Sequence, residues 1–381
     1  MDFEPNETQL LIQRTARDYA ERAIRPVAAA LDREERFPTE IMRELAGLGL
    51  MGVNVPAAYG GAEAGAVSYA LAMMEIARAC ASTAVTMAVT NMVGEVISRF
   101  GTEEQRLAYV PRLTSGEFVS ASFALSEPEA GSDPGGMRTV ARREGDGWVI
   151  DGQKQWITNG AHAGVYVVWA RTGDLSAGTK AITCFLVDGG APGVRIGKHE
   201  DKLGLRASNT VALTFEGVRV PASALLGSLN GGFRIAMMAL DGGRIGIASQ
   251  AIGIGTAALE AAVSYAKERK QFGRPIGENQ GIQWPLADSK TELDAARVLT
   301  LRAAWLKEND QAFSKEAAMA KLYASEAACR VCDRALQIHG GYGYVKDFAV
   351  ERHYRDVRVT RIYEGTSEIQ RLVIGRSVLR D

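Results

Sequence analysis

The stretch that decides the fold begins at Trp148-Val149-Ile150-Asp151-Gly152, a run typical of a strand that enters a turn. Short apolar runs follow at Val165 to Trp169 and Ala181 to Val187, both between glycine-containing turns, and Val211 to Phe215 alternates. No helical pattern separates these runs. Short strands at this spacing predict a β-barrel or sandwich, and they argue against a doubly wound sheet.

The residues before this β segment have helical periodicity. Apolar residues recur at helical spacing from Leu10 to Ile24, and Pro38 ends one helix and precedes the next. The stretch from Tyr69 to Arg99 is long, rich in small residues and thinly charged. It predicts a buried helix with a break near Gly94.

After the β segment the pattern is helical again. One helix begins near Pro285, and a second runs from Glu316 to Leu336 before His339-Gly340-Gly341 ends it. The apolar face of the first consists of Leu293, Ala296, Leu299, Ala303 and Leu306. Both patterns predict long helices that pack by one face.

The order of helices, strands and helices gives an α+β fold class by segregation. We expect an N-terminal helical domain at 1–118, a middle β-domain at 119–226 and a C-terminal helical domain at 227–381. The 381 residues are 46% hydrophobic and 23% charged, which is ordinary for a globular protein with a large core.

Charge and cysteine content exclude several classes of protein. The chain has 44 Lys and Arg against 45 Asp and Glu, so it lacks the basic field of a general nucleic-acid binder. Four cysteines are too few for a disulfide scaffold. Asp2, Glu4 and Glu7 have the wrong sign for a targeting peptide, and Ala79 to Gly94 is too short and polar to span a membrane. We therefore expect a cytoplasmic protein with no membrane or nucleic-acid partner.

Several common catalytic motifs are absent. The sequence contains no GxxxxGK[ST], GxSxG or HExxH, and its four histidines have no metal-ligand spacing. Cys329 and Cys332 are interpreted as core residues one helical turn apart. Gly253-Ile254-Gly255 lies in a helical pattern with no strand before it, so we interpret it as a site of close helix packing.

Two segments of the β region have the composition of a ligand site. Phe123 to Asp133 is a strand-like run that enters a Pro/Gly loop, where backbone N–H groups can approach phosphate oxygens. In Trp156-Ile157-Thr158-Asn159-Gly160, Trp156 and Thr158 share one face of a strand. A planar ring could pack on the first and receive a hydrogen bond from the second.

A third segment, Ile362 to Arg371, places Glu364 before a glycine and ahead of an apolar helix that Thr366 or Ser367 could cap. A carboxylate in such a loop can face a pocket and act as a base. From spacing alone, a solvated loop residue is the favoured interpretation.

Together these three segments resemble the acyl-CoA dehydrogenase family, closest to its short-chain (butyryl-CoA) branch, over essentially the whole chain. Further matching segments follow in the same order. They are Lys202 to Ser208, Leu240 to Ala248, Glu268 to Gly273 with Gln280, and Gln337 to Tyr344. The resemblance implies a helical N-terminal domain, a middle β-domain, a C-terminal four-helix bundle, FAD bound across a subunit interface, and a homotetramer.

The resemblance also assigns site residues. Those that line the flavin and its phosphates would be Phe123, Leu125, Ser126, Gly131, Ser132, Trp156, Ile157 and Thr158. Those that reach a neighbouring subunit's FAD would be Arg269, Phe272, Gln280, Gln337, Ile338, Gly340 and Gly341. Thr366 and Glu368 would complete the cofactor site, and the substrate contacts would be Ser132, Asp241, Gly243, Arg244 and Gly365.

The implied reaction is dehydrogenation of a saturated acyl-CoA to the trans-2-enoyl-CoA. Glu364 would remove the α-hydrogen as general base while the β-hydrogen leaves as hydride to the flavin. Electrons would pass to an electron-transfer flavoprotein. Some branches carry the base just before the arginine of the substrate helix; here that position is Gly243, which favours Glu364. Arg244 would contact CoA or form an ion pair with Asp241.

The substrate range is less defined. No arginine lies between Ala79 and Ile97, which disfavours a dicarboxylyl-CoA. The family's short-chain branch has Gly-Pro near Gly94, whereas this sequence has Glu95, either an exposed helix residue or one that recognises a polar acyl group.

The sequence leaves some other functions of the fold open and disfavours others. Branched, aromatic or polar acyl-CoA substrates stay open, as does a flavin- or acyl-CoA-binding protein without turnover. The chain is short for an acyl-CoA oxidase, and Glu364 argues against desulfinase-like and nitroalkane-oxidising relatives. The least specific alternative is a helical scaffold without cofactor.

Overall fold

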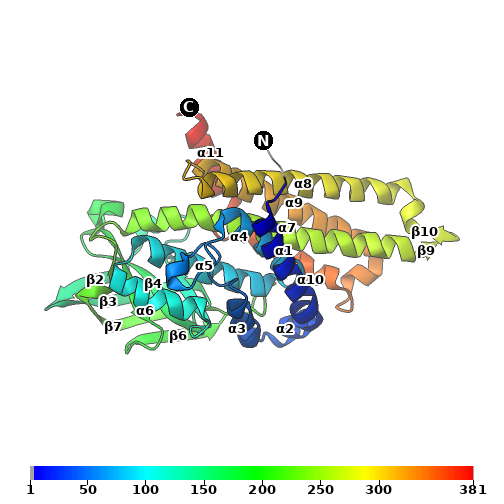
Figure 1. Cartoon of the computed structure of the whole chain (residues 1–381). Coiled ribbons are helices and arrows are strands. Elements are labelled where there is room, and N and C mark those ends of the chain that lie inside the picture. The colour runs from blue at the N-terminus through cyan, green and yellow to red at the C-terminus, as the bar shows by residue number, and fades with distance from the viewer. Residues whose placement is uncertain (1–3, 381) are drawn as a thin grey trace.

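The computed structural model describes residues 4–380, and Figure 1 shows a sheet region at one end of the molecule and long helices extending to the other. The N-terminal helices are α1 (Glu7–Tyr19), α2 (Ala28–Glu34), α3 (Thr39–Gly47), α4 (Gly65–Ala79), α5 (Ala81–Phe100) and α6 (Glu103–Thr114). The strands are β1 (Ser120–Ala124), β2 (Val140–Glu144), β3 (Gly147–Thr158), β4 (Ala163–Arg171), β5 (Ile182–Asp188), β6 (Val194–His199), β7 (Thr210–Pro221) and β8 (Leu225–Leu226). The C-terminal elements are α7 (Gly232–Glu268), the hairpin β9 (Lys270–Gln271) and β10 (Arg274–Pro275), α8 (Gln280–Glu308), α9 (Ser314–His339), α10 (Ala349–Val357) and α11 (Ser367–Val378).

The predicted α+β class is confirmed. Helices change to strands between Thr114 and Ser120, and strands change back to helices between Leu226 and Gly232. The domain limits expected from the sequence lie in these two connections. As predicted, α3 begins at Thr39, directly after Pro38.

The helical break expected near Gly94 is instead at Cys80. This residue is extended (φ −154°, ψ 111°) and separates α4 from α5, whereas Gly94 lies inside α5. A Cβ on Gly94 would lie 3.3 Å from Val55, so the glycine permits close packing without interrupting the helix. Glu95 therefore belongs to a continuous helix.

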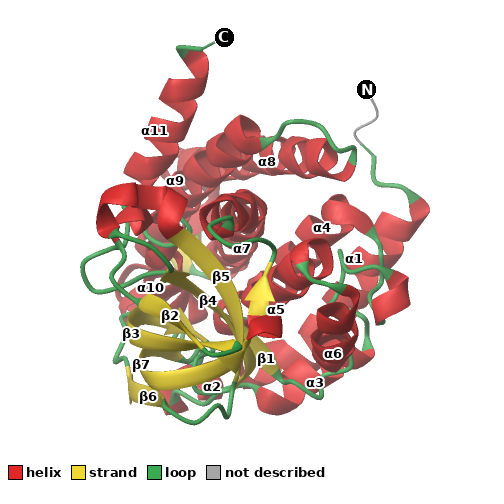
Figure 2. Ribbon diagram, turned by 90° about the vertical axis from the view of Figure 1, so that its left-hand side faces the viewer, coloured by secondary structure: helices red, strands yellow, loops and turns green. Residues whose placement is uncertain are grey.

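The middle domain is one mixed sheet of eight strands, ordered β6-β7-β3-β2-β4-β5-β8 with β1 beside β4 (Figure 2). β1 and β2 pair with β4 in parallel, and the other pairings are antiparallel. The turn predicted at Gly152 is wrong, because β3 continues through a register shift there and through a second one before Ile157. Trp156, in this second irregularity, has a φ of 62°.

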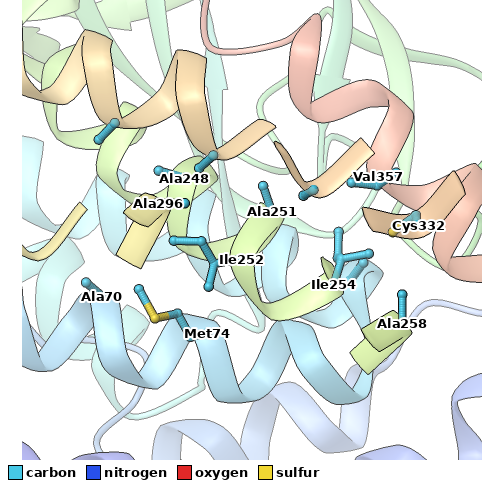
Figure 3. Packing of buried hydrophobic residues seen from close by; sticks show 14 of the residues in the cluster. Ala70, Met74, Ala248, Ala251, Ile252, Ile254, Ala258, Ala296, Cys332 and Val357 are labelled. Carbon is cyan, nitrogen blue, oxygen red and sulfur yellow. The ribbon is translucent and has the colours of Figure 1, made fainter. Parts of the chain in front are cut away.

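Helix α7 is the central element of the C-terminal domain. It packs against α4, α8 and α9, and Figure 2 shows it surrounded by these helices. Gly253 and Gly255 permit this contact, as predicted: a Cβ on Gly253 would lie 2.3 Å from the Met74 carbonyl oxygen. Figure 3 shows side chains of α4, α7, α8 and α9 meeting in this core, which also contains Cys332.

Helix α7 is long and apolar enough to cross a membrane, judged by length and composition alone. The sequence patterns had not indicated such a helix. Most of the apolar window of α7, 83%, is buried inside the protein, as in the core helix of a globular domain. No other helix within residues 4–380 meets these criteria.

Candidate active site

Glu364 lies in a strained turn between α10 and α11. Glu364 and Gly365 both have left-handed backbone conformations, with φ values of 53° and 85°. The Gln370 side chain donates to the carbonyl oxygens of Glu364 and Gly365 at 3.0 and 2.8 Å, and Lys321 Nζ donates to that of Gly365 at 2.7 Å. Thr366 caps α11 by accepting from the Ile369 N–H at 3.3 Å. The surrounding structure therefore holds Glu364 in a conformation that a non-glycine residue rarely adopts.

The Glu364 carboxylate faces α7. Its Oε2 atom is buried and has no hydrogen-bond partner within residues 4–380. A Cβ on Gly243 would lie 2.8 Å from this atom, so only glycine allows the approach. Burial raises the pKa of Glu364 to about 7, although Arg244 and Lys321 oppose the shift. A carboxylate with this pKa and a free oxygen can accept a proton near neutral pH.

Gly243, which approaches this carboxylate, also lines a small cavity of about 30 Å³. The residues that line it include Asn91, Met92, Glu95, Met238, Gly243 and Lys307. They come from α5, α7 and α8, and Tyr69 of α4 also lines the cavity, so four helices border this space.

A loop of the β-domain is fixed by a buried ion pair. Lys154 Nζ lies 2.8 Å from Glu127 Oε1 and donates to the Leu125 carbonyl oxygen at 3.1 Å. Glu127 also accepts the backbone N–H groups of Arg138 and Thr139. The pair holds the loop that follows β1 against β3.

Residues around this loop leave open surface. The Trp156 side chain is 62% exposed, which is unusual for so large an aromatic residue. A Cβ on Gly131 would meet no atom within 4 Å. Phe123 packs on Trp169 with ring centroids 4.2 Å apart. The geometry leaves room for a large planar ligand beside the loop.

A second, wider hollow of about 780 Å³ lies at the far end of α7. Its lining includes Tyr265, Arg269, Phe272, Ile338, Gly340 and Gly341. Phe272, at the hairpin between β9 and β10, is fully exposed (100%). No Cβ on Gly340 or Gly341 would meet another atom within 4 Å, so this hollow also has room for a ligand.

Comparison with known proteins gives consistent results. The N-terminal, middle and C-terminal domain models of acyl-CoA dehydrogenase match residues 6–117, 122–218 and 230–379. The short-chain specific acyl-CoA dehydrogenase of Bos taurus mitochondria is 52% identical over 376 residues, which are 98% of this chain and 90% of the relative. The chain belongs to the acyl-CoA dehydrogenase family. The family resemblance is thus confirmed, and the protein is an oxidoreductase by family.

Two solved structures have nearly the same fold as this acyl-CoA dehydrogenase. Butyryl-CoA dehydrogenase from Megasphaera elsdenii is 42% identical, with a TM-score of 0.98 and full coverage of both chains. The same values hold for a chain in the structure described as "Electron transferring flavoprotein of Acidaminococcus fermentans: Towards a mechanism of flavin-based electron bifurcation".

Of the substrate residues expected of an acyl-CoA dehydrogenase, Asp241, Gly243 and Arg244 lie on α7, and Gly365 follows Glu364, whereas Ser132 lies on the exposed loop after β1. Gly243 and Gly365 lie beside or next to Glu364, and Arg244 is buried. Arg244 forms the ion pair with Asp241 that the sequence left open as the alternative to a CoA contact, and its Nε atom is buried without a partner among the described residues. The ion pair thus leaves part of the guanidinium available to a ligand.

The expected cofactor residues fall into two separated groups. One surrounds the loop after β1, and the other lines the hollow at the far end of α7. Leu125 and Ile157 are buried in hydrophobic clusters. Gln280 begins α8, Gln337 lies in the last turn of α9, and both are exposed outside the lining of that hollow.

The side chain of Thr366 forms a hydrogen bond within the chain, whereas that of Glu368 is exposed. The Thr366 hydroxyl is engaged as the cap of α11. The Glu368 side chain is 77% exposed, 4.0 Å from Arg371. Ser126 is half-buried, whereas Ser132 is exposed at the end of the loop.

Sequence reasoning missed the residues that position Glu364 and the loop, namely Lys154, Lys321 and Gln370. All three side chains are buried. The signal for Lys321 was present in the sequence, since it is a lysine among alanines on the inward face of a helical pattern. A charged residue at an apolar position is almost always paired or functional.

Proposed function

We propose that this acyl-CoA dehydrogenase uses FAD to convert a short-chain saturated acyl-CoA to the trans-2-enoyl-CoA. The observation that carries the proposal is the Glu364 Oε2 atom, which is buried and unpaired against Gly243, a residue that also lines a small cavity. The likeness to enzymes named for short-chain and butyryl-CoA substrates supports the chain length.

Glu364 is suited to remove the α-proton of a thioester. The α-hydrogen is weakly acidic, so its removal needs a base held close and poised near working pH. Burial raises the pKa of Glu364 to about 7, and the lysine and arginine nearby keep it from rising further. By family resemblance, the backbone N–H of Glu364 would donate to the thioester oxygen, where negative charge develops.

The exposed surface around Trp156 and Gly131 and the hollow at the end of α7 have features that suit FAD. When bound, FAD supplies the acceptor for the hydride that leaves the β-carbon. Trp156 offers an exposed aromatic face, and the space above Gly131 would admit backbone contact with phosphate. Phe272, Gly340 and Gly341 offer the corresponding surface at the second hollow.

The separation of the two groups supports an oligomer. Gly243 lies in α7 beside the base, where the reacting part of FAD must also lie, and Arg269, at the second hollow, directly follows the last residue of this helix. At the standard helical rise the two residues are roughly 40 Å apart. One FAD cannot reach both groups of a single chain. Each FAD would therefore take one group from each of two subunits, as in the homotetramer that the resemblance implies.

An electron-transfer flavoprotein is the proposed electron acceptor, supported by the likeness to a chain in the Acidaminococcus structure. A role in fatty-acid β-oxidation accords with this reaction. A cytoplasmic location stays a prediction from the cysteine content, the acidic N-terminus and the polarity of the stretch from Ala79 to Gly94.

Anaerobic titration of the purified protein with saturated acyl-CoAs of increasing length tests the proposal. We expect butyryl-CoA or a near neighbour to bleach the flavin absorbance. A flavin spectrum that no saturated acyl-CoA bleaches would overturn the dehydrogenase activity, and a protein that retains no flavin would overturn the cofactor.

A further inference from the structure

Resting on the proposed function, we propose that the ion pair between Glu95 and Lys307 forms the far wall of the acyl site and limits the acyl group to short chains. The pair joins α5 to the last turn of α8, with Lys307 Nζ 2.6 Å from Glu95 Oε1 and 2.8 Å from Oε2. The Lys307 side chain is 14% exposed and that of Glu95 30%. The sequence left open whether Glu95 is a solvated helix residue; it lines the cavity instead.

The pair and the base contact the same part of α7. A Cβ on Gly242 would lie 3.0 Å from Lys307 Nζ, and one on Gly243 would lie 2.8 Å from Glu364 Oε2. Two adjacent residues of α7 therefore lie next to the ion pair and the base, respectively. An acyl group whose α-carbon lies beside Glu364 has little distance to travel before it meets the pair.

The cavity that the ion pair lines together with Gly242 and Gly243 is small. A cavity of about 30 Å³ has room for roughly two water-sized groups. Its side walls are apolar, with Met92, Val96, Met238 and Ala239 among them. Such a space accepts the end of a short alkyl chain and leaves no room for a long one.

The charges of Glu95 and Lys307 make it unfavourable for a longer acyl chain to extend past the ion pair. Methylene groups pushed against the pair would strip water from both charged groups without replacing its hydrogen bonds, which is unfavourable. Displacing one partner would leave the other charge uncompensated in a half-buried site. The neighbouring Arg99 does not take the place of Lys307 as the partner of Glu95, since the Arg99 guanidinium lies over the Phe100 ring.

The continuity of α5 places Glu95 in this position. Asn91, Glu95 and Arg99 follow each other at intervals of four residues, so they share one face of the helix. All three line the cavity. The Gly-Pro pair of the family's short-chain branch is absent here, and Gly94 continues the helix so that the next side chain meets Lys307.

Two double variants that leave the net charge unchanged test whether Glu95 and Lys307 form the end of the acyl site. In Glu95→Ala/Lys307→Ala the cavity is lengthened without changing the net charge near Glu364, and Glu95→Gln/Lys307→Gln removes the charges at similar volume. The matched control is Lys290→Gln/Asp294→Asn, which removes an exposed 2.6 Å ion pair on the same helix. The measurement is kcat/KM of each FAD-loaded protein for octanoyl-CoA and butyryl-CoA.

We expect the octanoyl-to-butyryl ratio to rise about tenfold or more in the alanine double variant, as expected for burying two additional methylenes. It should rise less in the glutamine variant and stay at the wild-type value in the control. An unchanged ratio in both Glu95/Lys307 variants, with flavin content intact, would overturn the inference.

A binding measurement separates this inference from the proposed reaction. In a Glu364→Gln background, the Kd of each acyl-CoA is read from the change in flavin absorbance, without turnover. A shift of the Kd preference toward octanoyl-CoA in the alanine variant would support the wall even if wild type oxidises no acyl-CoA. An unchanged Kd preference would overturn the wall, whatever the activity of the wild type.

Discussion

The chemistry of single residues depends on how Glu364 is held. Its backbone is strained, its Oε2 atom is buried and unpaired, and its pKa is raised to about 7 by burial. A buried carboxylate oxygen without a partner destabilises the fold, because buried polar atoms normally have hydrogen-bond partners. The strain and the missing partner thus both point to a reacting group at this position.

Gly243→Ala tests the approach of Glu364 to α7. The new Cβ would lie 2.8 Å from Oε2, so the carboxylate must move. Because a displacement of about 1 Å can cost about 10²-fold in rate, we expect kcat to fall by about that factor. Steady-state kinetics measures this. Gly281→Ala, where a Cβ meets nothing within 4 Å, is the control, and equal kcat in the two variants would contradict the account.

Lys321→Met tests the electrostatic support of the base. The buried Lys321 ammonium lowers the pKa of Glu364, as Arg244 does, so its removal should raise that pKa. Because Glu364 acts when ionised, the acid limb of the pH profile of kcat/KM should move to higher pH. Lys290→Met, on the surface of α8, should leave the limb in place. A limb that stays fixed in the Lys321 variant would show that this lysine has only a structural role.

Among the elements, β3 and the loop after β1 depend on one buried ion pair. In Lys154→Met, Glu127 would stay buried with two backbone N–H donors but no cation. We expect a loss of about 3 kcal/mol in the free energy of unfolding, measured by urea denaturation. Arg142→Ala, which breaks an exposed pair with Asp151, should cost less than about 1 kcal/mol. Equal losses would contradict a special role for the Lys154 pair.

The elements also show what sequence patterns can and cannot predict. Long helices with one apolar face, such as α8 and α9, are visible from periodicity, and Pro38 marks the start of α3. The break at Cys80 was missed because it rests on an extended backbone within a uniformly buried stretch. The bulge at Gly152 was taken for a turn because glycine permits both, and only pairing with β7 distinguishes them.

The sequence predicted the residues of the site that lie in local motifs and missed those that act through long-range contacts. The resemblance identified Glu364, Gly243 and Arg244, whose motifs are local in sequence. Lys321 and Lys154 act across 44 and 27 residues of sequence, so no local pattern connects them to Gly365 and Glu127. Contacts of this range come only from tertiary structure.

At the scale of the whole molecule, the proposed function requires an active site shared between two subunits. Co-expression of Glu364→Gln and Phe272→Asp chains tests this, because each hybrid interface would contain one site with both residues intact. Neither variant alone should be active, and random pairing should restore about a quarter of the wild-type activity per subunit. Activity is measured on copurified complexes that carry two different affinity tags. No recovery in these hybrids would contradict a shared site.

The most direct test of the central claim is the rate of flavin bleaching by butyryl-CoA, followed by anaerobic rapid mixing across pH. We expect the second-order rate constant in wild type to rise with pH through about 7, since the base must be ionised. A loss of about 10³-fold or more is expected in Glu364→Gln, with flavin retained. Bleaching of the Glu364→Gln protein at the wild-type rate would show that another group removes the proton.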